Sequence, residues 1–251
     1  MELQKASVLK RTAAWLLDAI LTCVLAVGFA VLLSVVLRYD DHNAALQAGY
    51  DKYESQYGVV FEITSGEYEA MTQAERANYD TAYEALIADQ DVLREYNLLI
   101  NLSLVIVSVG ILLGVLAMEF FVPLMLKNGQ TVGKKAFGIG LVKKDGVKIN
   151  TMQLFVRALL GKYTIETMIP VYILLMFFLG VMDMTGTIVL LALLVVQLIC
   201  LIVTSTNSMI HDLMAGTVTV DISSQKVFQS TDELIAYTKR MAAERAKKQD
   251  Y

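Results

Sequence analysis

The stretch "LKRTAAWLLDAILTCVLAVG", residues 9–28, decides the fold, because it is apolar enough for a lipid bilayer and yet contains a carboxylate. Arg11 and Asp18 are seven positions apart, so at about 100° per residue their side chains point to the same helix face. A carboxylate within a membrane span costs about 2.5–3.5 kcal/mol on insertion scales and marks a functional or structural site. Asp18 is therefore expected to have a partner elsewhere in the chain.

The composition of the 251 residues supports a membrane protein, with 56% hydrophobic residues, 18% charged residues and a mean hydropathy of +0.53. The net charge of −4 is a poor guide, because basic and acidic residues occupy different segments. We expect the lipid bilayer as the principal partner and no nucleic acid.

Four transmembrane helices are predicted, at residues 12–37, 98–126, 167–182 and 186–206. Asp18 is the only charged residue in the body of the first span, and Glu119 is the only one in the second. The first run is interpreted as a retained anchor, since it is too long for a signal peptide and no small-residue cleavage site ends it.

The distribution of Lys and Arg predicts a multi-pass plasma-membrane protein with both termini in the cytoplasm. Basic residues concentrate at the N-terminus, in 127–150 and after 206, whereas the loop between the first two spans holds thirteen acids and four basic residues. The predicted organisation is a cytoplasmic N-terminus and first span, an acidic extracytoplasmic loop, a second span, a basic cytoplasmic loop, two further spans and a cytoplasmic tail, at residues 1–37, 38–97, 98–126, 127–166, 167–206 and 207–251.

The acidic loop is expected to be helical and is rich in tyrosine. One hypothesis is an acidic vestibule that concentrates cations near the membrane. The other is a solvated helical hairpin whose tyrosines pack together or lie at the membrane interface.

The basic loop "NGQTVGKKAFGIGLVKKDGVKIN", residues 128–150, is glycine-rich but is no phosphate loop, because only three residues separate Gly129 from Gly133. A strand at 137–142, a turn at Asp145-Gly146 and a return strand at 147–150 are predicted, with a further strand at 216–221 beside them. Residues 151–168 form a predicted amphipathic helix in the cytoplasmic interface, with Lys162 and Glu166 spaced to pair. The tail is expected to form a capped helix.

A polar cluster is expected near the cytoplasmic ends of the spans, and its candidate members are Arg11, Asp18, Glu119, Arg157, His211 and Asp212. A carboxylate that carries protons or cations must change its protonation state, whereas a structural carboxylate stays ionised and paired with a helix end or an arginine. Glu119 is equally interpretable as a side chain that reaches out to the interface. The His211-Asp212 pair is open to a simpler interpretation, a turn cap.

Gly110 and Gly114 form a G-x-x-x-G pattern that predicts close helix packing. Cys23 and Cys200 both lie within spans, which predicts neither a disulfide nor a cysteine-based metal site. The sequence has no nucleophile–base pair, so no enzymatic activity, catalytic residue, metal or cofactor is expected.

Together, Arg11, Asp18, "GQTVGKKAFGIGLVKKDG", "VRALLGKY" and "HDLMAGTVTVD" resemble the RDD family of membrane proteins over about residues 5–222, interrupted by the long acidic loop. The family is named for one arginine and two aspartates, which the resemblance assigns to Arg11, Asp18 and Asp212. It implies transport, with cation/proton antiport reported for some members, so monovalent cations and protons are the expected substrates. The alternative is a non-transporting accessory protein that binds a partner through its outer loop or tail. Four spans are few for a complete carrier, which favours a homo-oligomer or a larger membrane complex.

Overall fold

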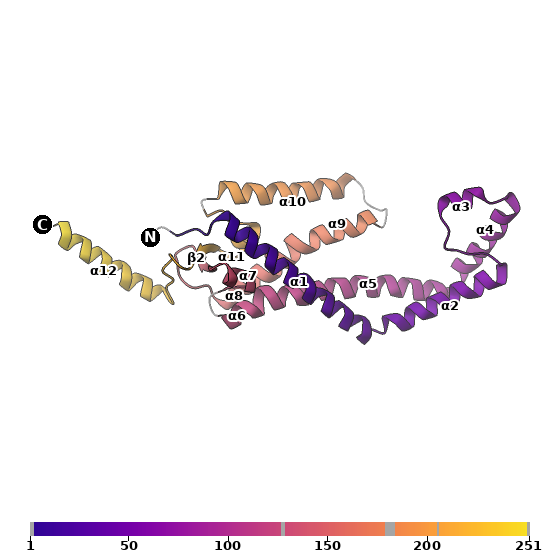
Figure 1. Ribbon diagram of the computed structural model, residues 1–251, viewed down its shortest axis with the longest axis horizontal. Helices are drawn as coiled ribbons and strands as arrows, with labels where there is room; N and C mark the ends of the chain where they lie inside the picture. The colour runs from indigo at the N-terminus through magenta and orange to yellow at the C-terminus, as the bar shows by residue number, and fades with distance from the viewer. Residues whose placement is uncertain (1–2, 127–128, 179–183, 205, 250–251) are drawn as a thin grey trace. The chain divides into compact units, whose positions relative to one another are not determined.

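The computed structural model describes residues 3–126, 129–178, 184–204 and 206–249 (Figure 1). Four helical stretches are long and apolar enough to cross a membrane, namely Val8–Val36, Gln90–Leu126, Thr151–Phe177 and Met184–Val203. The prediction of an all-α polytopic membrane protein with four spans and a small β element is confirmed. Residues 127–128, 179–182 and 205, which the predicted segments include, lie outside the described residues.

The elements follow one another in this order: α1 (Val8–Val36), α2 (Tyr39–Tyr57), α3 (Ser65–Ala70), α4 (Gln73–Ala88), α5 (Gln90–Leu116), η1 (Ala117–Phe121), α6 (Val122–Leu126), α7 (Val132–Ala136), β1 (Ile139–Lys143), α8 (Thr151–Val156), η2 (Arg157–Met168), α9 (Ile169–Phe178), α10 (Met184–Val203), α11 (Ile210–Ala215), β2 (Thr217–Asp221) and α12 (Thr231–Gln249). The segments η1 and η2 are π-helical. The chain divides into two compact units, Gly28–Gly110 and the remainder, and α1 and α5 contribute to both.

The unit Gly28–Gly110 contains α2, α3 and α4 of the acidic loop. Thr64 and Thr72 cap α3 and α4 in reciprocal boxes with glutamates three residues later. The ring of Phe61 packs edge-on against Tyr50, Tyr79 and Tyr83, with centroids 5.7–6.3 Å apart. The aromatic side chains thus hold this helical unit together, as the hairpin hypothesis predicts.

In the other unit, β1 and β2 form an antiparallel pair in which Ile139 lies opposite Asp221. The predicted return at 147–150 forms only as far as an antiparallel bridge. Lys143 donates its N–H to the Val147 carbonyl and Val142 bridges Lys148, but no strand follows, because Lys148 donates its N–H to the Phe228 carbonyl. The N-terminal residues cover the free side of β2, where the Ala6 N–H donates to the Thr219 carbonyl.

Both prolines of the chain follow the π-helical segments at the same spacing. Pro123 lies four residues after Glu119, and Pro170 lies four residues after Glu166. Proline has no N–H to donate to the carbonyl four residues earlier, and its ring collides with that carbonyl in a regular α-helix. Local widening to i→i+5 bonds, such as Val122 N–H to Ala117, accommodates the proline without ending the helix.

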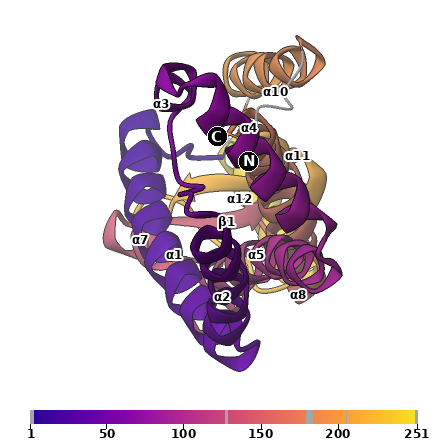
Figure 2. The ribbon, with the colours of Figure 1, turned by 90° about the vertical axis from the view of Figure 1, so that its right-hand side faces the viewer.

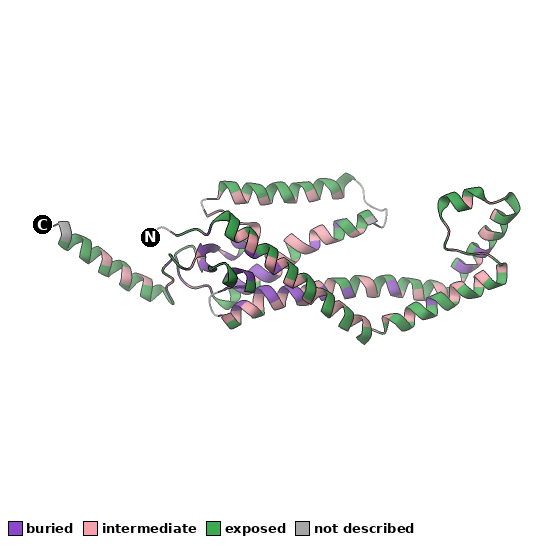
Figure 3. Ribbon diagram, viewed as in Figure 1, coloured by how far each residue is buried: buried purple, intermediate pink, exposed green. Residues whose placement is uncertain are grey.

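The helix from Thr151 to Phe178 is continuous through α8, η2 and α9, so no break separates the predicted interfacial segment from the predicted third span. Its Arg157, Ala158, Gly161 and Met168 are buried. Figure 3 shows the buried residues of this unit gathered around η1, α7, η2, α11 and the two strands. By contrast, α10 lies at the margin in Figures 1 and 2, next to α9.

Gly114 allows α5 to approach α1 closely, since a Cβ placed there would lie 3.0 Å from the Ala26 nitrogen and from the Thr22 carbonyl oxygen. Gly114→Leu is therefore expected to lower the unfolding temperature of the purified protein in detergent, with an overpacking cost of about 1–3 kcal/mol. Gly28→Leu is the matched control, because nothing lies within 4 Å of its Cβ position. Equal unfolding temperatures for the two variants would contradict this packing.

Candidate functional site

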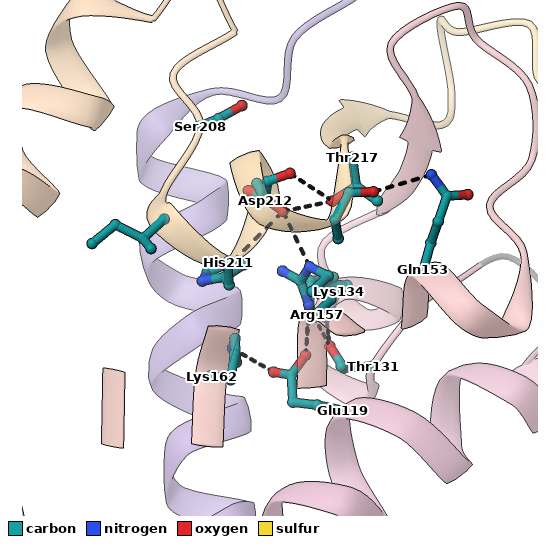
Figure 4. A network of polar contacts seen from close by, with 12 residues as sticks. Glu119, Thr131, Lys134, Gln153, Arg157, Lys162, Ser208, His211, Asp212 and Thr217 are labelled. Carbon is teal, nitrogen blue, oxygen red and sulfur yellow. Dashed lines mark hydrogen bonds and ion pairs between the residues drawn. The ribbon is translucent and has the colours of Figure 1, made fainter. Parts of the chain in front are cut away.

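A cluster of buried ionisable side chains lies where α1, η1, α7, η2 and α11 meet (Figure 4). It contains four Lys or Arg side chains, four carboxylates and one histidine, and we call it the charge cluster: Arg11, Asp18, Glu119, Lys134, Arg157, Lys162, Glu166, His211 and Asp212. The number of positive charges equals the number of negative charges when His211 is neutral. All six residues expected from the sequence are members.

Arg157 is the centre of the charge cluster, with only 2% of its side chain exposed. Its Nη1 donates to Glu119 Oε2 at 2.8 Å and its Nε donates to Asp212 Oδ1 at 3.1 Å. One guanidinium thus joins η1 to α11 through η2. Charge-assisted bonds of this kind are among the stronger hydrogen bonds in proteins.

Asp212, the second residue of the His-Asp pair, accepts hydrogen bonds from three directions. Besides Arg157, Thr217 Oγ1 donates to Oδ1 at 3.1 Å, and Arg11 Nη2 lies 3.5 Å from Oδ2. Burial acts to raise the pKa of Asp212, but the neighbouring arginines hold it below its ordinary value. Arg11 Nη1 also donates to the carbonyl of Asn207 at 2.5 Å, which ties α1 to the segment between α10 and α11.

Asp18 accepts hydrogen bonds from the first turn of α7. Its Oδ1 accepts from the Gly133 backbone N–H at 2.7 Å, and its Oδ2 accepts from the Thr131 hydroxyl. A Cβ at Gly133 would lie 2.3 Å from the Ala14 carbonyl oxygen, so only glycine permits this approach. Asp18 is 3% exposed and binds a neighbouring helix end, which is one of the structural alternatives that the sequence left open.

Glu119 is surrounded by three cations and does not reach out to the interface, so that interpretation is wrong. Lys162 Nζ donates to Oε1 at 2.5 Å, while Oε2 accepts from Arg157 and lies 3.5 Å from Lys134 Nζ. Lys162 therefore pairs with Glu119 and not with Glu166, because the π-helical turn of η2 directs it toward η1. The carboxylate is 3% exposed.

His211 forms the far side of the charge cluster with Glu166. Its Nδ1 lies 2.7 Å from both Glu166 oxygens, and its backbone N–H donates to Oε1 at 3.2 Å. Gly161 makes this approach possible, because a Cβ there would lie 2.5 Å from the Cβ of His211. Burial and the nearby Arg157 lower the pKa of His211, so the imidazole is neutral at pH 7.

Among the basic side chains of the charge cluster, Lys134 has the pKa that its surroundings change most. Its Nζ lies 3.3 Å from Thr131 Oγ1, 3.5 Å from Glu119 Oε2 and 4.0 Å from Asp18 Oδ2. Burial lowers the pKa of Lys134 to about 8, although the two carboxylates act in the opposite direction. Near neutral pH this ammonium is consequently close to releasing its proton.

A cavity of about 260 Å³ adjoins the charge cluster. Five basic side chains line it, together with Asp18 and Asp212, and these are Arg11, Lys134, Arg157, Lys162 and His211. Its remaining walls are mainly apolar and include Trp15 of α1, Leu201 of α10 and Met209. Seven of the nine members of the charge cluster thus line a space that could hold a small ligand.

Sequence reasoning did not place Lys134, Lys162 and Glu166 in the cluster, nor Thr131 beside it. Two signals were available. The pattern Glu-x-x-x-Pro occurs twice, as "EFFVP" at 119–123 and "ETMIP" at 166–170, and marks both π-distorted carboxylates. Thr131-Val-Gly133-Lys134 is a helix start whose first N–H groups need a buried acceptor.

The arrangement defines a polytopic membrane protein with a neutral, largely buried charge cluster beside a cavity. The chain belongs to the RDD family, whose model matches residues 5–216, and this stretch includes every member of the cluster. No curated protein and no solved structure matches the chain.

The balance of charges around α7 can be tested with a double-mutant cycle. Asp18→Asn leaves an excess positive charge and Lys134→Gln an excess negative one, so each is expected to destabilise the protein. The double variant restores neutrality. We expect its loss of unfolding free energy to be smaller than the sum of the single losses by about 0.5–3 kcal/mol. Additive losses, measured by denaturation in detergent, would show that the two charges do not interact.

Proposed function

We propose that the chain exchanges a small monovalent cation for a proton across the membrane. The observation that carries the proposal is the position of Lys134, whose buried ammonium lies among a hydroxyl and two carboxylates at 3.3–4.0 Å and whose pKa is about 8. Of these groups, Lys134 and Asp18 line the cavity, through which water and ions would reach the site.

The exchange follows from charge neutrality. When Lys134 releases its proton to water in the cavity, the charge cluster keeps four carboxylates but only three cations. A buried excess charge is costly, so the deprotonated cluster favours entry of one monovalent cation. Reprotonation of Lys134 expels that cation. One proton therefore moves against one cation, and the buried site is neutral in both states.

The oxygens around Lys134 suit this role. Carboxylate and hydroxyl oxygens are the ligands that hard cations prefer, and Glu119, Asp18 and Thr131 supply them around one point. Asp18 contributes one oxygen and also positions α7 through Gly133. In this mechanism Asp18 is a positioning residue and Lys134 carries the proton, whereas the sequence favoured Asp18 as the carrier.

A second candidate function is a non-transporting accessory protein. One observation favours it: both oxygens of Asp18 accept hydrogen bonds from the start of α7, as an architectural anion would. It would bind a partner through the acidic loop of the unit Gly28–Gly110 or through α12, and it would act within a larger complex. Either function is non-enzymatic, and four spans favour a homo-oligomer or a heteromeric assembly.

We further propose a plasma-membrane location with cytoplasmic termini, from the segregation of Lys and Arg. Ser55 on α2 is exposed, so Ser55→Cys is expected to react with an impermeant maleimide in intact cells. The unsubstituted protein is the control for Cys23 and Cys200. Labelling of the new cysteine only after cell lysis would reverse the orientation.

The exchange can be measured in proteoliposomes that carry an imposed pH gradient. Addition of Na⁺, K⁺ or Li⁺ is expected to dissipate the gradient, and the rate is expected to rise as the pH passes about 8, where Lys134 loses its proton. Lys134→Gln removes the titrating group and should reduce the pH-dependent flux to the background of empty liposomes.

Lys135→Gln is the matched control, because Lys135 is exposed, adjoins Lys134 and does not line the cavity. It should retain the flux and its pH dependence. Wild-type liposomes that respond to none of the three cations, with a protein shown to be folded, would refute exchange and favour the accessory function.

A further inference from the structure

The cavity beside the charge cluster presents two different walls. The inner wall carries four Lys and Arg side chains but only two carboxylates, because Glu119 and Glu166 do not line it. The outer wall is apolar and is formed by Val8 and Trp15 of α1, Leu201 of α10 and Met209. A ligand that satisfies both walls has an anionic head and a hydrocarbon tail.

Two of the cavity cations are more accessible than the others. The side chains of Arg11 and Lys162 are 12% and 14% exposed, whereas Arg157 is 2% exposed. Within the described residues, the Lys162 ammonium donates only to Glu119, which leaves two of its three N–H donors. The shortest hydrogen bond of Arg11 goes to a neutral group, the carbonyl of Asn207. Its Nη2 lies 3.5 Å from Asp212 Oδ2. Both cations can therefore accept an additional anionic partner.

The apolar wall is continuous with exposed apolar surfaces of two candidate membrane-spanning helices. Val8 is 51% exposed and Trp15 is 53% exposed on a helix whose most apolar window has no buried residue. The most apolar window of α10, the helix that carries Leu201, likewise has no buried residue. A tryptophan with an apolar body and a polar N–H is suited to the depth of lipid headgroups. The cavity thus borders exposed apolar surface of α1 and α10 at the level of the charged residues.

We propose that this cavity binds the headgroup of an anionic membrane phospholipid, with the phosphate between Arg11 and Lys162 and an acyl chain along Trp15 and Leu201. The free inorganic phosphate ion has the same head chemistry but would leave the apolar wall without a partner. Lipid occupancy does not depend on ion exchange, and it would fix α10 beside α1.

The single tryptophan of the chain, Trp15, reports on this site directly. The intact protein is reconstituted in phosphatidylcholine, and a small mole fraction of a lipid with brominated chains is added to quench its fluorescence. Brominated phosphatidylglycerol is compared with brominated phosphatidylcholine of the same chains. We expect about a fivefold stronger apparent association for the anionic lipid, because no choline cation offsets the negative charge of its phosphate.

Lys162→Gln is expected to bring this ratio close to one, and Lys135→Gln should leave it unchanged, because Lys135 is exposed and outside the cavity. Millimolar inorganic phosphate should not compete. Equal quenching by the two lipids in the wild-type protein would overturn the proposal, and this measurement needs no variant to fold. An equal loss of preference in both lysine variants would also overturn it, since that pattern indicates a diffuse surface charge. Competition by inorganic phosphate would also contradict lipid binding and would indicate that the ligand of the cavity is a soluble anion.

Discussion

The structure depends on Arg157, a buried guanidinium held between Glu119 and Asp212. Breaking a buried ion pair by removing one partner costs about 3–5 kcal/mol, because it leaves the other charge without compensation. Here one cation serves two anions on different helices, and each anion has further cationic neighbours. No member of the network can move alone, which fixes the positions of η1, η2 and α11 relative to one another.

The backbone departs from regular geometry where this network requires it. The two buried glutamates both precede a proline by four residues and lie in π-helical turns, so η1 and η2 are widened at the residues that carry charge. Gly133 and Gly161 stand where a side chain would collide with the Ala14 carbonyl and with His211. Pro123, Pro170, Gly133 and Gly161 thus serve the approach of charged groups rather than the termination of helices.

Much of the fold could be predicted from hydropathy and charge, because spans of about 20 apolar residues and blocks of Lys and Arg are strong signals. Arg11, Asp18 and Asp212 were found because each lies in or beside an apolar run. Lys134, Lys162 and Glu166 were missed because each lies in a segment that is polar in sequence, where a charge is expected to be solvated. Their burial follows from tertiary packing of α7 and η2 against η1, which local patterns do not encode. The return strand failed for a related reason, since Phe228 competes for its hydrogen bonds.

Neutrality connects these features to a chemical function. In a buried site with four positive and four negative charges, the loss of one charge is costly unless a charge of the same sign replaces it. Arginine does not release its proton near physiological pH, and Lys162 keeps a direct 2.5 Å bond to Glu119. Lys134 differs from them, because its contacts with the two carboxylates are longer and burial brings its pKa to about 8. Lys134 is therefore the member that can lose its positive charge, and it is also the member surrounded by oxygen ligands. Because the site must stay neutral, loss of its proton favours entry of a cation.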